Sequence, residues 1–68
     1  MSVETEFLIV CIEEYKAAHH LTGREVIDLF NTYDVSGYIR RHYDALHTTG
    51  GLYNVADIDD YIARRKTA

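Results

Sequence analysis

The sequence predicts an all-α protein, a small bundle of four short helices in a single domain. Two helix-start signatures support this prediction: in Leu21–Val26 and in Tyr53–Ile58, a small polar residue is followed by an acid three positions later. The polar side chain caps backbone N–H groups that the first turn leaves unpaired, and the acid offsets the helix dipole. The 68 residues also contain no proline, and their apolar residues recur every 3.6 residues or so, at about the spacing of an amphipathic helix. The predicted domain is 1–68, and the predicted helices are 3–19, 23–33, 35–47 and 55–66.

The first predicted helix is apolar on more than one face. Ser2 is the expected N-cap, and Ile9 and Val10 add a second apolar face beside the expected core stripe. A helix of this kind is usually covered by its neighbours or by another chain. Ile9 and Val10 are therefore candidate partner-binding residues, although the sequence leaves open whether they face solvent, the core or a second subunit. The expected core stripe is Phe7, Leu8, Cys11, Ile12 and Tyr15.

The second and third predicted helices each carry an apolar stripe and are joined by a short turn. Asn31 and Asp34 supply the turn chemistry, and Asp34 is expected to cap the third helix. Thr48–Gly51 is expected to end the third helix, since glycine tolerates the left-handed residue that commonly closes one. The inward residues expected on the second helix are Val26, Ile27, Leu29, Phe30 and Tyr33. Those expected on the third helix are Val35, Tyr38, Ile39, Tyr43 and Leu46.

The fourth predicted helix begins after Asn54, its expected N-cap, with Asp57 as the acid of the first turn. Asp59 and Asp60 are assigned to the solvated face, because this acidic cluster lacks the loop glycine and distal glutamate of an EF-hand. Arg64–Lys66 suits the negative C-terminal end of a helix. The expected inward residues are Ile58, Tyr61 and Ile62.

Composition argues against several classes of protein. The net charge of −4 opposes nonspecific binding to nucleic acid. The longest apolar run, Phe7–Ile12, is far shorter than the roughly 20 residues that a membrane span needs. No basic region of a signal peptide follows the first residue, so the expected location is cytoplasmic. A single cysteine excludes an intramolecular disulfide and a cysteine-rich metal motif.

No set of residues converges on a catalytic or metal-binding pattern. Cys11 lies in mid-helix among aliphatic residues, with no neighbouring cation or base to activate its thiol, and is expected to be buried and inert. The histidine pairs are adjacent or five positions apart, a spacing that does not suit a shared metal ion. Thr48–Gly51 follows a helix and has no lysine, unlike a phosphate-binding loop. We therefore expect no catalytic residue, no metal and no cofactor.

Arg40 and Arg41 give the third predicted helix a basic outer face. Together with the short turn before that helix, they suggest a helix-turn-helix whose second helix enters the major groove of DNA. The turn lacks a well-placed glycine and the chain is acidic. DNA binding through Arg40 and Arg41 is therefore the alternative hypothesis.

Six segments carry a resemblance to a known family: Glu6–Lys16, Gly23–Phe30, Tyr33–Val35, Tyr38–Ile39, Leu46–Gly50 and Asp57–Ile62. Taken together and in order, they resemble a family of short bacterial proteins of unknown function (domain of unknown function 3791). The resemblance implies no established activity and no catalytic residue. It implies a protein partner and an antitoxin-like role, because the family resembles the products of accessory genes that lie beside genes for proteins with an ADP-ribosyltransferase-like fold. His47, Thr48 and Thr49 fall inside a matched segment and are further candidate partner-binding residues.

The leading functional hypothesis is a non-enzymatic module that binds another protein or itself. It rests on the second apolar face of the first helix and on the six tyrosines, because tyrosine is enriched at protein interfaces. A small enzyme using His47 with Thr48 or a tyrosine ranks last, since so short a helical chain rarely encloses a substrate pocket.

Overall fold

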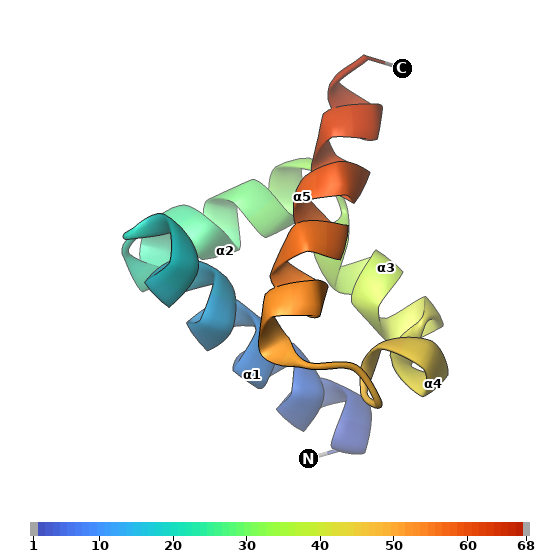
Figure 1. Cartoon of the computed structure of the whole chain (residues 1–68). Helices are drawn as coiled ribbons and strands as arrows, with labels where there is room; N and C mark the ends of the chain where they lie inside the picture. Colours follow the sequence, from blue (N-terminus) through green and yellow to red (C-terminus); the bar gives the residue numbers. More distant parts are fainter. Residues whose placement is uncertain (1, 68) are drawn as a thin grey trace.

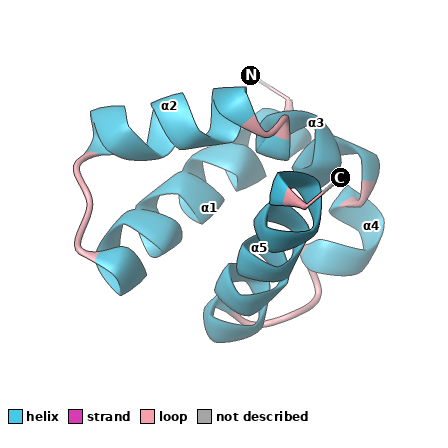
Figure 2. Ribbon diagram, turned by 90° about the horizontal axis from the view of Figure 1, so that it is seen from above, coloured by secondary structure: helices cyan, strands magenta, loops and turns pink. Residues whose placement is uncertain are grey.

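Alpha-helices account for nearly all of the described chain. The computed structural model describes residues 2–67, and in this range it contains helices and turns but no strand (Figure 2). The predicted fold class is therefore confirmed. Met1 and Ala68, which the predicted domain of residues 1–68 includes, lie outside the described residues. The helices are α1 (Val3–His19), α2 (Gly23–Thr32), α3 (Val35–Arg41), α4 (Tyr43–Leu46) and α5 (Gly51–Lys66).

Helix α1 is the element around which the others pack, because it contacts α2, α3 and α5. Figure 1 shows α5 crossing in front of α1, while α2 turns back from the end of α1. Ser2 caps α1 as predicted, its hydroxyl accepting the Thr5 backbone N–H at 3.2 Å. His20 closes the helix in the left-handed conformation, with φ of 55°. The bounds of α1 match the prediction for residues 3–19.

The core is a single apolar cluster to which every helix contributes. Each large apolar side chain that is fully buried stabilises the fold by roughly 1.5–3 kcal/mol before conformational entropy is subtracted. Phe7, Ile12 and Leu29 are partly buried against this cluster. The buried members are Leu8, Cys11, Tyr15, Val26, Phe30, Val35, Ile39, Leu46, Ile58 and Ile62.

Helix α2 begins with the predicted capping box and differs from the prediction at one inward residue. The Glu25 backbone N–H donates to Thr22 Oγ1 at 3.1 Å, and the Thr22 N–H donates to the Glu25 carboxylate at 2.9 Å. Ile27, which we expected to face inward, is 46% exposed. Successive helical residues are rotated by about 100°, and Ile27 is turned that far from the buried Val26, on the side away from Leu29.

The third predicted helix, residues 35–47, is wrong as a continuous element. The chain leaves the α-helix at His42, with φ of −110° and ψ of 21°, and α4 then starts in a new direction. This break lets Tyr43 pack edge-on against Phe7 of α1, with ring centroids 5.5 Å apart. Asp34 occupies the predicted N-cap position, but its side chain makes no capping hydrogen bond and its φ is 55°.

The start of the last helix was also predicted wrongly. Helix α5 begins at Gly51 with Gly50 as N-cap, and Asn54, the predicted cap, lies inside the helix and is 3% exposed. Its amide oxygen accepts the Thr49 hydroxyl, so the buried side chain is satisfied. Neither glycine has a positive φ, and thus no left-handed glycine closes the preceding helix. A Cβ at Gly51 would overlap the carboxylate of Glu14, so a larger residue there would require the flexible Glu14 side chain to move.

The capping box at the start of α2 gives a pH-dependent prediction. The hydrogen bond from the Thr22 backbone holds the pKa of Glu25 below its ordinary value of 4.5. A carboxyl whose pKa is lowered by folding stabilises the native state above its unfolded pKa, and this stabilisation is lost as the pH falls through the folded value. We expect Glu25→Gln to lower the urea midpoint at neutral pH and to have progressively less effect below about pH 4. An effect of equal size at both ends of this pH range would contradict the prediction.

Candidate functional site

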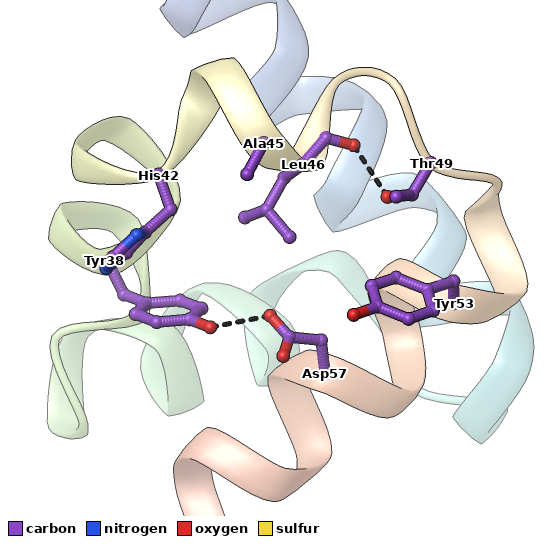
Figure 3. Close-up of a pocket in the computed structure, with 7 residues that line it drawn as sticks. All are labelled: Tyr38, His42, Ala45, Leu46, Thr49, Tyr53 and Asp57. Carbon is purple, nitrogen blue, oxygen red and sulfur yellow. Dashed lines mark hydrogen bonds between the residues drawn. The ribbon is translucent and has the colours of Figure 1, made fainter.

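Two hollows on the surface share a pair of lining residues, Tyr38 and His42. Tyr38 lies in α3, and His42 directly follows that helix. The first, which we call the Asp57 hollow, has a volume of about 230 Å³ and lies between α4 and α5 (Figure 3). The second, which we call the arginine groove, has a volume of about 320 Å³ and lies between α3 and α5. The Asp57 hollow is lined by Tyr38, His42, Ala45, Leu46, Thr49, Tyr53 and Asp57. The arginine groove is lined by Tyr38, Arg41, His42, Tyr61, Arg64 and Arg65.

A short hydrogen bond between Tyr38 and Asp57 crosses the Asp57 hollow. The Tyr38 hydroxyl donates to the Asp57 carboxylate at 2.6 Å, and Figure 3 shows the two side chains pointing at each other from facing helices. Burial, together with this carboxylate, raises the pKa of Tyr38 to about 12. The hydroxyl therefore keeps its proton at neutral pH and cannot act as a base. Its chemistry here is that of a donor that joins α3 to α5.

A second tyrosine makes an equivalent bond to α5 from the other side of the core. The Tyr15 hydroxyl of α1 donates to Asp59 at 2.6 Å. Burial and the hydrogen bond to Asp59 raise the pKa of Tyr15 as well. The other oxygen of Asp59 lies 2.9 Å from Nε2 of His19, so this carboxylate receives two partners from the last two turns of α1.

These bonds correct two predictions about the acidic cluster of α5. Asp57 does not belong to a helix cap, because α5 begins six residues earlier at Gly51. Asp59 does not belong to a solvated face, since it is half-buried and bonded to Tyr15. Asp60 is exposed as predicted and pairs with Arg64 at 3.1 Å.

The arginine groove combines cationic side chains with a floor of stacked rings. Tyr38 and Tyr61 stack with centroids 4.1 Å apart and an interplanar angle of 21°. The Arg65 guanidinium lies 5.5 Å from the centroid of Tyr61, within cation–π range. Arg41 reaches Asp34 at 3.5 Å, and Arg64 makes its pair with Asp60. Planar guanidinium groups beside aromatic faces are suited to binding a carboxylate or phosphate together with an apolar group.

The predicted partner-binding pair of α1 reaches the molecular surface. Ile9 is 46% exposed and Val10 is 49% exposed, although α1 contacts three other helices. Val3, two turns before Val10, is also exposed. Because residues seven apart lie on one helix face, Val3 and Val10 share a line. Ile9 points about 100° away from Val10, and the exposed acids Glu6 and Glu13 lie between them on the helix surface.

The predicted cluster His47, Thr48 and Thr49 follows α4 and is exposed. Nδ1 of His47 lies 2.7 Å from the Tyr43 carbonyl, and its ring stacks on that of Tyr43. The Thr48 hydroxyl donates to a carbonyl of α4, and the Thr49 hydroxyl donates to the Leu46 carbonyl at 2.8 Å. All three therefore make polar contacts that end α4, and Thr49 also borders the Asp57 hollow.

The two arginines of the DNA-binding alternative lie in different places. Arg40 and Arg41 are both exposed, but Arg41 lines the arginine groove whereas Arg40 does not. The two side chains point about 100° apart on α3, so only Arg41 borders the groove.

Cys11 is buried, as predicted. Burial, with a smaller contribution from the Glu14 carboxylate, raises the pKa of its thiol to about 12. Among residues 2–67, no three histidine, cysteine, aspartate or glutamate side chains gather closely enough to hold a metal ion. No helix in this range is both long enough and apolar enough to span a lipid bilayer.

The arginine groove was missed by the sequence analysis, although the sequence contains a signal for half of it. Asp57, Tyr61, Arg64 and Arg65 recur three and four positions apart, so they share one face of a helix. We read Tyr61 only as a core residue and the arginines only as compensation for the helix dipole. The other half of the groove comes from α3, and no local pattern indicates that α3 lies opposite that face.

Comparison with known protein families places residues 6–65 within the family described as Protein of unknown function (DUF3791). The match extends from the first turns of α1 almost to the end of α5, and it includes both hollows and the pair Ile9 and Val10. Neither the curated proteins nor the solved structures include a match to the chain. The family description assigns no activity that could be placed on these residues.

The bond between Tyr38 and Asp57 can be tested by removing one hydroxyl. We expect Tyr38→Phe to lower the free energy of unfolding by about 1–2 kcal/mol, since a hydrogen bond to a charged group is involved. Tyr61→Phe is the matched control, because its ring stacks on Tyr38 but its hydroxyl lies 3.5 Å from its acceptor, the Asp34 carbonyl. Urea unfolding followed by circular dichroism provides the measurement.

The same pair predicts a loss of stability in alkali. Folding raises the pKa of Tyr38 from 10.0 to about 12, so its stabilising effect is complete below the unfolded value and is lost as the pH rises toward the folded one. Tyr38→Phe should therefore be less destabilising relative to wild type at high pH than at neutral pH. If the two tyrosine variants were equally stable at neutral pH, the bond would not have the role assigned to it.

Proposed function

The chain belongs to the DUF3791 family of proteins of unknown function, and from this premise we propose that it is a non-enzymatic module that binds another protein. The partner we propose is an ADP-ribosyltransferase-like protein, the kind of partner that the family resemblance implies. In that pairing the module acts as an accessory or antitoxin-like subunit. Self-association is the other form that the same surface could support.

The observation that carries this proposal is the uncovered strip on α1, which we define as Val3, Glu6, Ile9, Val10 and Glu13. Its three apolar members are each about half exposed, and its two acids are exposed as well. The strip lies on the helix that every other long helix packs against. An exposed helix face that combines apolar side chains, here Val3 and Val10 on one edge and Ile9 on the other, with acids between them can dock into a groove of a partner.

The polar groups of the hollows support a binding role over a catalytic one. Tyr38 keeps its proton, and its hydroxyl donates to the Asp57 carboxylate in a hydrogen bond that joins two helices. The Thr49 hydroxyl has a single proton, which lies between the Leu46 carbonyl at the end of α4 and the Asn54 amide oxygen. These side chains serve the fold, and a general base or nucleophile must instead be free to reach a substrate.

DNA binding is the second candidate, favoured by the exposure of Arg40 and Arg41 on the helix that follows a short turn. In this alternative, α3 would lie in the major groove. The acidic residues of the chain oppose it, since its net charge is −4.

Aspartate substitutions on the strip test the protein-binding proposal. We expect Ile9→Asp combined with Val10→Asp to weaken the complex with the co-expressed ADP-ribosyltransferase-like protein by at least about tenfold, because two apolar side chains would no longer be buried. Ile27→Asp on α2 is the matched control, since Ile27 has the same 46% exposure as Ile9 but lies outside the strip. Affinity is measured by isothermal titration calorimetry and folding by thermal melts.

The proposal fails if wild-type protein sediments as a monomer at high concentration and also recovers no complex with the co-expressed neighbour. It fails equally if the strip variant binds as well as wild type while Ile27→Asp does not.

The DNA alternative predicts a different pattern. Arg40→Ala combined with Arg41→Ala should weaken binding to promoter DNA and reduce the slope of log affinity against log salt by about two, because two phosphate contacts would be lost. Electrophoretic mobility shifts at several salt concentrations measure both quantities. No shift at low salt with wild-type protein would exclude this alternative.

A further inference from the structure

We infer that the arginine groove binds an acidic segment of a partner protein, in which a carboxylate stands next to an apolar side chain. This inference rests on the proposed role as a protein-binding module and adds a second binding surface, with a defined chemistry, to the strip on α1. The groove brings together Arg41 from α3 with Arg64 and Arg65 from α5 over the stacked rings of Tyr38 and Tyr61.

The arginines of the groove are available to an incoming carboxylate. The pairs of Arg41 with Asp34 and of Arg64 with Asp60 join exposed side chains, at 3.5 and 3.1 Å. Exposed ion pairs of this kind contribute only about 0–1 kcal/mol, so a ligand can replace or share them at little cost. Arg65 is held over Tyr61, which fixes its guanidinium at the rim of the groove.

The floor of the groove explains why the ligand should also be apolar. Tyr38 and Tyr61 stack on each other with centroids 4.1 Å apart, so their facing sides cover one another, and carbon atoms of both side chains line the groove between the two helices. Tyrosine and arginine are the residues most enriched at the energetic centres of protein interfaces, where a ring packs on apolar atoms and a guanidinium binds an acid. The volume of about 320 Å³ is at the small end of the range for ligand sites, which suits one or two side chains.

The charges around the groove favour a peptide carboxylate over a nucleic acid. Asp34 and Asp60 flank the cationic side chains, and Asp57 lies on the far side of Tyr38. A continuous phosphate backbone would pass close to these carboxylates, and each approach would be repulsive. A single carboxylate seated between the arginines avoids them.

A titration with a defined peptide tests the site. The probe is the acetylated and amidated tripeptide Glu-Phe-Glu, and its uncharged counterpart Gln-Phe-Gln is the control ligand. We expect Glu-Phe-Glu to produce saturable ¹H–¹⁵N chemical-shift changes confined to the residues around the groove. Gln-Phe-Gln should bind at least about fivefold more weakly, since the charge-assisted hydrogen bonds to arginine are lost.

The chain offers a closely matched pair of variants. Arg64→Gln should weaken binding of Glu-Phe-Glu by at least about fivefold, whereas Arg24→Gln should leave it unchanged. Both arginines are exposed and pair with an aspartate four positions away in their own helix, Arg24 with Asp28 and Arg64 with Asp60. Arg24 lies on α2, outside the groove. Arg64→Lys, which keeps the charge but not the planar fork, should give an intermediate affinity.

Three outcomes would overturn the inference. Glu-Phe-Glu could cause no localised chemical-shift changes. Alternatively, Gln-Phe-Gln could bind as tightly as Glu-Phe-Glu. A short DNA duplex could instead occupy the groove more tightly than the peptide at the same salt concentration. These results do not depend on whether a partner binds the strip on α1. If a partner complex depends on Ile9 and Val10 but the peptide does not bind, only the groove inference is refuted. If the peptide binds but no partner complex forms, the proposed function is refuted.

Discussion

Two hydrogen bonds from tyrosine hydroxyls to aspartates of α5 determine where the last helix lies. Tyr15 of α1 donates to Asp59, and Tyr38 of α3 donates to Asp57, each at 2.6 Å. Burial of Ile58 and Ile62 determines which face of α5 meets the core, but it tolerates small shifts of the helix, because the hydrophobic effect is not directional. Hydrogen bonds to ionised groups are directional and stronger than neutral ones. They therefore fix one orientation in a small chain that has no disulfide.

Both hollows depend on this orientation. With Asp57 held against Tyr38, the next turn of α5 places Tyr61 flat on the same ring, at a centroid distance of 4.1 Å. The following turn then carries Arg64 and Arg65 to the rim of the arginine groove. A structural bond and a binding surface thus share one tyrosine, whose hydroxyl faces one hollow while its ring forms the floor of the other.

The parts of the fold that local chemistry determines were predicted well, and the parts that depend on distant residues were not. Helices α1 and α2 follow from their caps, Ser2 and Thr22, which act within their own first turns. No proline or glycine marks the break at His42, and the contact that accompanies it joins Tyr43 to Phe7, a residue far away in the sequence. The second helix-start signature wrongly predicted Asn54 as an N-cap. In the structure its side chain is buried and bonds Thr49 beyond the end of α4.

The candidate sites show the same division. The sequence shows that the apolar surface of α1 is wider than a single core stripe, but it leaves open which way Ile9 and Val10 face; in the structure both are about half exposed. The arginine groove could not be predicted, because it exists only where α3 and α5 face each other across the Tyr38–Asp57 bond. Spacing within one helix shows which side chains share a face, but it contains no information about the helix that will lie opposite.

The burial of Cys11 has a consequence for where this protein can operate. Its sulfur is enclosed within the core, and its thiol stays protonated well above neutral pH. Thiolates, rather than thiols, react with oxidants and disulfides. While the chain is folded, Cys11 is therefore protected from glutathione and peroxide, and it offers two folded copies no route to a disulfide-linked dimer.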